Sequence, residues 1–161
     1  MSDVTSTKIG QDTSVSFEKI LNTTGYLSYR IEGVSMRPLL RQGLDVVQII
    51  KKGTGRCKKF DAVLYKVKDK YILHRIIEVR ETEYVILGDN CLRKEYGITD
   101  EQILGVLIGI IKNGKHIRTT DKAYLLYVHL WCAIYPLRVI IKFINAQLDR
   151  LRRLARRDSK F

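Results

Sequence analysis

Residues 71–90 read YILHRIIEVRETEYVILGDN, and two strand patterns within this stretch decide the predicted fold. The runs YILHRIIEV and EYVILGD are short and rich in Val, Ile and Tyr, which are enriched in β-strands. Gly88, Asp89 and Asn90 follow the second run as a turn should. The stretch therefore predicts two strands of an antiparallel sheet.

The same pattern extends on both sides of this stretch. Further strand-like runs are YLSYRIEG, DVVQII, DAVLYKV and ILGVLIGIIK, and Gly, Asp, Asn or Lys turns separate them. We expect a mainly β protein with three parts. A polar arm and short helix occupy 1–25, an antiparallel β domain spans 26–118, and a C-terminal hydrophobic and basic helical segment covers 119–161.

Bulk composition narrows the classes of partner and cofactor. The chain has 161 residues, enough for one domain, and its net charge of +12 suits nucleic acid, an anionic membrane or acidic peptides. It has three cysteines and no CxxC pair, which argues against a disulfide framework and a zinc site. No metal or cofactor is expected. The odd number of cysteines fits a reducing compartment best, and the N-terminus shows no apolar signal-peptide region.

The C-terminal segment combines apolar and basic patterns. Residues 123–137, AYLLYVHLWCAIYPL, are apolar, but shorter than the about 20 residues a bilayer requires. In residues 138–157 Ile140, Ile144 and Leu148 recur at helical spacing, and the opposite face is basic. This pattern predicts an amphipathic helix, so residues 123–157 are a candidate membrane-surface segment. The alternative is two helices that cover the β domain or form a dimer interface.

Three polar residues lie on or just after predicted strands. Ser35 stands in GVSMRP, where it is either a turn former or a nucleophile. His74 lies on an apolar strand face, where a histidine is more often a satisfied core residue, and Asp89 lies in the turn after a strand. A serine nucleophile needs a base within hydrogen-bond reach, and the base benefits from an orienting group. Spacing alone does not bring the three together.

The order of these stretches resembles the signal peptidase I family, which shares its fold with LexA-like self-cleaving repressors. The resemblance covers roughly residues 30–112 and consists of Ser-Met-x-Pro, then His-Arg-Ile, then Gly-Asp-Asn. It is to the type that has histidine rather than lysine as the base. It implies that Ser35 attacks a peptide carbonyl, that its backbone N–H helps stabilise the oxyanion, and that His74 transfers the proton. Asp89 would hold the imidazole or the local backbone.

Several positions depart from the family pattern. Many relatives have a hydroxyl where this chain has Gly33, and the family's Gly-Asp turn reads Gly43-Leu44-Asp45 here. The histidine type usually has another Asp soon after Gly-Asp-Asn. Here Cys-Leu-Arg-Lys-Glu follows, and the next Asp is Asp100. The third site member is therefore either Asp89 or Asp100. The N-terminal membrane span of secretory signal peptidases is also missing.

These observations predict a serine endopeptidase of the signal peptidase I type that cleaves a leader or signal-like peptide of a precursor. The basic C-terminus favours a cytoplasmic location on the membrane's inner face. The alternatives are a LexA-like self-cleaving or binding regulator and a catalytically inactive membrane-associated homologue. Nucleic acid is not the expected partner, because no aromatic residue interleaves the basic KKGTGRCKK loop. Cys91, with no histidine nearby in sequence, is interpreted as a spectator.

Overall fold

The structure, a computed structural model that describes residues 16–158, is an eight-stranded antiparallel sheet with helices at both ends of the chain. The elements in chain order are α1 (Phe17–Thr24), β1 (Tyr26–Arg30), β2 (Val46–Lys51), β3 (Ala62–Val67), β4 (Lys70–Val79), β5 (Tyr84–Leu87), β6 (Glu95–Ile98), the 3₁₀ turn η1 (Asp100–Gln102), β7 (Ile103–Lys112), β8 (Lys115–Arg118), α2 (Lys122–Ala133) and α3 (Tyr135–Asp158). The predicted mainly antiparallel β architecture with C-terminal helices is confirmed. The prediction missed β6 and β8, which have four residues each and only one β-branched residue, an isoleucine, in each.

Strand order follows β1-β2-β7-β3-β4-β5-β6, with β8 paired to β7. One edge of β7 pairs with β2, and the other pairs first with β3 and then with β8. Gly105 of β7 lies between β2 and β3, opposite Lys51 on one side and Leu64 on the other. A Cβ atom on Gly105 would lie 2.5 Å from Ile49 Cγ2 and 2.6 Å from the Ile50 carbonyl oxygen. Only glycine fits there, which allows the strands to approach closely.

Two hydrophobic clusters lie on opposite faces of β3 and β4, because side chains alternate along a strand. The first core includes Leu64 and Leu73, and the second core includes Tyr65, Ile72 and Ile76. The first core consists of Phe17, Leu21, Leu27, Ile31, Met36, Leu40, Val47, Ile49, Ala62, Leu64, Leu73, Leu107, Ile110, Tyr124 and Val128. The second core consists of Cys57, Val63, Tyr65, Ile72, Ile76, Tyr84, Ile86, Ile98 and Ile103. His74 therefore points to the second core's side of β4, and Arg75 to the first core's side.

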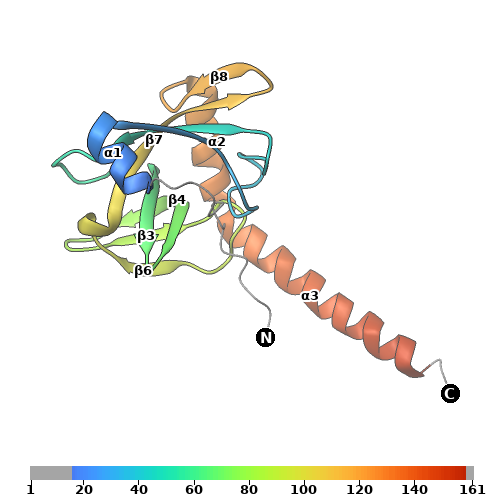
Figure 1. Cartoon of the computed structure of the whole chain (residues 1–161). Helices are drawn as coiled ribbons and strands as arrows, with labels where there is room; N and C mark the ends of the chain where they lie inside the picture. The colour runs from blue at the N-terminus through green and yellow to red at the C-terminus, as the bar shows by residue number, and fades with distance from the viewer. Residues whose placement is uncertain (1–15, 159–161) are drawn as a thin grey trace.

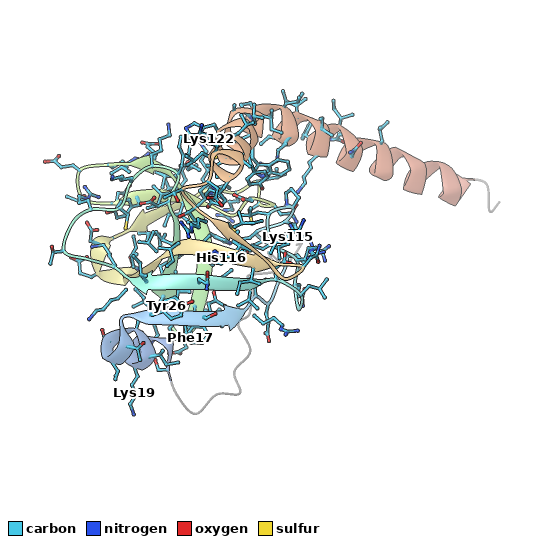
Figure 2. The ribbon with its side chains drawn as sticks, turned by 90° about the horizontal axis from the view of Figure 1, so that it is seen from above. Phe17, Lys19, Tyr26, Lys115, His116 and Lys122 are labelled. Atoms are coloured by element: carbon cyan, nitrogen blue, oxygen red, sulfur yellow. The ribbon has the colours of Figure 1, made fainter. Side chains whose placement is uncertain are left out.

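The helices differ in how they contact the sheet. α1 and α2 both contribute to the first core, and Figure 2 shows α1, with Phe17 and Lys19, beside the strand that begins at Tyr26, well apart from Lys122 at the start of α2. α3 extends away from the sheet (Figure 1). Among the described residues no single helix is long and apolar enough to cross a membrane. By length and composition the bent pair of α2 and Tyr135–Asn145, with an angle of 53°, could do so.

A buried ion pair ties β4 to the turn after β5 and to α2. Arg75 donates from Nε and Nη2 to the two carboxylate oxygens of Asp89, both at 2.8 Å, and the two side chains are 1% and 2% exposed. Arg75 Nη1 also donates to the Phe60 carbonyl at 3.0 Å and to the Tyr124 hydroxyl at 3.2 Å. Tyr127 donates to Asp89 Oδ2 at 3.1 Å. The additional hydrogen bonds offset the cost of taking both charges out of water.

Breaking this pair from one side should destabilise the fold strongly. We expect Asp89→Asn or Arg75→Met to cost about 3–5 kcal/mol of unfolding free energy, because the remaining charge is buried without its partner. The measurement is urea unfolding. Glu78→Gln is the control, since the Glu78–Arg80 pair is half-exposed and solvent screens it, so its loss should cost much less than the loss of the buried pair. Equal costs for the buried and the exposed variants would contradict this account.

Candidate active site

His74 is held by a carboxylate on one ring nitrogen. It lies in β4, is 4% exposed, and its Nδ1 is 2.7 Å from Glu95 Oε1 at the start of β6. Tyr65 donates to the other oxygen of Glu95 at 2.6 Å and lies 3.2 Å from Nδ1. An ionised carboxylate only accepts hydrogen bonds, so Nδ1 carries a proton and donates it to Glu95. In the neutral ring, Nε2 is then the basic nitrogen.

The surroundings of His74 favour its protonated form. Burial lowers the pKa of His74, but hydrogen bonds with Cys91 and Glu95 outweigh burial and raise this pKa to about 9. Burial raises the pKa of Glu95, but its hydrogen bonds with His74 and Tyr65 hold the pKa below its ordinary value. Burial and the Glu95 carboxylate raise the pKa of Tyr65, so the phenol keeps its proton and stays a donor. In this arrangement the Glu95 carboxylate stabilises the protonated ring of His74.

The other nitrogen of His74 faces the corner that carries Ser35. A Cβ atom on Gly88 would lie 2.9 Å from His74 Nε2, 2.9 Å from the Ser35 carbonyl oxygen and 2.8 Å from Cys91 Sγ. These three atoms therefore surround one point, and no side chain fits at Gly88. The Asn90 N–H donates to the Ser35 carbonyl at 2.7 Å, which fastens the turn after β5 to the serine corner. Ser35 is 3% exposed.

The loop that carries Ser35 is closed at its base by backbone and carboxylate contacts. Ile31 donates to the Asp45 carbonyl at 3.0 Å and accepts from the Gly43 N–H at 2.9 Å. The buried Asp45 carboxylate accepts from the Arg41 backbone at 2.8 Å and from Arg41 Nη2 at 2.6 Å. Gly33 has φ +83°, in the left-handed region that disfavours a side chain. This position therefore contributes no hydroxyl to the corner.

The structure brings the Ser35 corner and His74 together and directs the carboxylate of Asp89 elsewhere. Asp89 follows Gly88 directly, but its carboxylate binds Arg75 and Tyr127. Asp100 accepts from Tyr84 at 2.6 Å and pairs with Lys52 at 3.1 Å. A catalytic role for either aspartate stays a prediction.

Glu95 and Tyr65 are the functional candidates that the sequence analysis did not select. Glu95 ends the Cys-Leu-Arg-Lys-Glu run after Gly-Asp-Asn, in which the resemblance to the histidine type led us to expect a further Asp. A carboxylate of the other kind in that run was the available signal. Tyr65 carried none, because its contact depends on the β3–β4 register, in which Val63 lies opposite His74.

The C-terminal helices hold the segment that follows Gly88. Trp131 Nε1 and Arg138 donate to the carbonyl oxygen of Asp89, the Trp131 bond at 2.8 Å. Lys142 donates to the Asn90 carbonyl at 3.1 Å, and Tyr135 donates to the Leu92 carbonyl at 2.6 Å. The positions 135, 138 and 142 share one face of α3. This face positions residues 89–92, and through them the serine corner.

Comparison with known proteins assigns no family. No protein-family model matches the chain, and no curated protein is significantly similar to it in sequence. In the part of the chain that the structure describes, no group of three or more His, Cys, Asp or Glu side chains could hold a metal ion.

Glu95→Gln tests the origin of the raised pKa. In the native chain we expect His74 to titrate near pH 9. Removing the Glu95 charge should move this midpoint to lower pH by about one unit or more, because an opposite charge in contact favours the protonated ring. NMR of the imidazole nitrogens measures the midpoint. Asp100→Asn, which removes a carboxylate with other partners, should leave it unchanged. An unchanged midpoint in Glu95→Gln would contradict the assignment.

Proposed function

We propose that the protein is a serine endopeptidase of the signal peptidase I type, with Ser35 as nucleophile and His74 as general base. The observation that carries the proposal is the orientation of His74. Glu95 holds Nδ1, and Nε2 faces the Gly88 position, where the main chain of Ser35 also lies. The antiparallel sheet with C-terminal helices is compatible with the signal-peptidase and LexA-like fold that the motifs suggest.

In the proposed reaction His74 accepts the Ser35 hydroxyl proton at Nε2 while the oxygen attacks the peptide carbonyl. The backbone N–H of Ser35 stabilises the oxyanion. The imidazolium then protonates the leaving amine, and water hydrolyses the acyl-enzyme. Glu95 stabilises the imidazolium, and Asp89 acts on the local backbone through its pair with Arg75. Because the pKa of His74 is about 9, the neutral base is the major form only at alkaline pH.

A second candidate function is that of a catalytically inactive homologue. The observation that favours it is Gly33, whose left-handed backbone leaves the corner without a side-chain donor for the oxyanion. Such a protein would bind peptides through the same corner and cleave none.

Ser35→Ala separates the two functions. We expect one set of peptide termini to disappear from cells that carry Ser35→Ala, since the nucleophile is lost, and cleavage of the corresponding peptide in vitro to fall by about 10³-fold or more. Mass spectrometry of peptide termini makes the comparison. Ser28→Ala, at an exposed position of β1, is the matched control. Identical termini in native and Ser35→Ala cells, with both proteins folded, would support the inactive homologue.

We further propose that α2 and α3 attach the protein to an anionic membrane surface on the cytoplasmic side. The α3 residues Leu137, Ile140, Ile141, Ile144 and Leu148 form one stripe, and each is at least 44% exposed. Leu126 and Leu130 of α2 are also exposed. By sequence the end of α3 is rich in arginine, which suits anionic headgroups beside an apolar face.

Vesicle flotation tests this attachment. We expect the protein to float with phosphatidylserine-containing vesicles, and Leu137→Asp to reduce the bound fraction at least about threefold, because it places a charge on the apolar stripe. Leu44→Asp is the matched control, since both residues are exposed leucines, 55% and 63% exposed, and Leu44 lies outside the helices. Substitution is preferable to truncation, because α2 and α3 also hold residues 89–92. Equal binding of the two variants would refute the proposal.

A further inference from the structure

Cys91 lies beside the catalytic imidazole. The turn that carries it is closed by a hydrogen bond of 2.8 Å from the Cys91 N–H to the Gly88 carbonyl. Its sulfur and His74 Nε2 approach the same point, at 2.8 and 2.9 Å from the position of a Cβ on Gly88. The sequence suggested a spectator because no histidine is near in the chain. The pairing of β4 with β5, with Arg75 opposite Leu87, brings the two residues together.

The imidazole nitrogen beside Cys91 is a buried group that needs a partner. Among the described residues, His74 Nε2 is one of two buried side-chain nitrogen or oxygen atoms without a conventional hydrogen bond. In the neutral ring this buried atom needs a hydrogen-bond donor, and in the protonated ring it needs an acceptor, so a thiol or its thiolate suits both forms. The Cys91 thiol faces it, and Glu95 on the opposite side of the ring stabilises the imidazolium that results from proton transfer.

The other two cysteines lack such a neighbour. Burial raises the pKa of Cys57 to about 11. Burial also raises the pKa of Cys132, which is half-buried like Cys91. Thiols in such surroundings react slowly, because the thiolate is the nucleophile. Cys132 is therefore an internal control of similar exposure without an imidazole.

We propose that Cys91 is a reactive thiol, activated by His74, and a modification site for small electrophiles. Nε2 of the neutral ring takes the thiol proton from Sγ, and when the ring is already protonated the thiol proton passes to water; both routes leave a thiolate beside an imidazolium. With an alkyl halide, the sulfur forms a bond to carbon and the halide leaves with the electron pair. An adduct on Sγ occupies the space beside Nε2. On the proposed function, this adduct prevents the imidazole from accepting the Ser35 proton.

The test is the rate of alkylation by iodoacetamide of the folded full-length chain at neutral pH, followed for each cysteine by peptide mapping. We expect Cys91 to react at least about tenfold faster than Cys132, and His74→Gln to bring the two rates within about threefold of each other. Cys57 reports folding, since it is buried and stays unlabelled in an intact chain. Glu95→Gln, which keeps the imidazole, should also slow Cys91.

Two results would overturn the proposal that Cys91 is reactive: equal alkylation rates for Cys91 and Cys132 in the native chain, or an unchanged Cys91 rate in folded His74→Gln.

Whether an adduct on Cys91 blocks peptide cleavage is tested separately. Peptide cleavage by the native chain should fall in proportion to alkylation of Cys91, and cleavage by Cys91→Ala should survive the treatment. Native chains that are alkylated at Cys91 and still cleave would overturn blocking. Absence of cleavage before treatment would refute the proposed function and leave the alkylation rates valid.

Discussion

The ion pair between Arg75 and Asp89 is the constraint on which the rest of the structure depends. Both side chains are almost completely buried, so each must stay opposite the other or leave a charge without water or partner. Arg75 is next to His74 in β4, and Asp89 is next to Gly88 in the turn after β5. Alternation along the strand sends Arg75 to one face and His74 to the other. The ion pair on the first-core face of β4 therefore also holds Gly88 next to His74 on the second-core face.

The C-terminal helices support the proposed site and also form the proposed membrane-binding surface. One face of α3 presents apolar side chains, and the other donates hydrogen bonds to the carbonyls of Asp89, Asn90 and Leu92. The same segment receives Tyr127 and Trp131 from α2. The geometry around Gly88 therefore depends on a part of the chain that follows the sheet. A displacement of α2 and α3 would alter the support of the serine corner.

The two nitrogens of His74 have different neighbours, and this difference underlies both proposals. Nδ1 is committed to Glu95, while Nε2 faces the point that Cys91 and the main chain of Ser35 share. A carboxylate on one side makes proton uptake on the other more favourable. The same imidazole can serve a serine hydroxyl or a thiol, and proton transfer from the thiol would make it unavailable to the serine.

The sequence by itself determined the mainly antiparallel sheet, the C-terminal helices and the candidates Ser35 and His74. Period-two patterns and turn residues are local, so they can be read from the chain. Strands β6 and β8 were missed because pairing, rather than residue type, makes them strands. Only the tertiary structure decided which carboxylate contacts His74. The sequence offered Asp89 and Asp100 for this role, and strand register instead gives Glu95 to the imidazole, Asp89 to Arg75 and Asp100 to Tyr84. The contact with Cys91 is likewise nonlocal, because it exists only after β4 and β5 have paired.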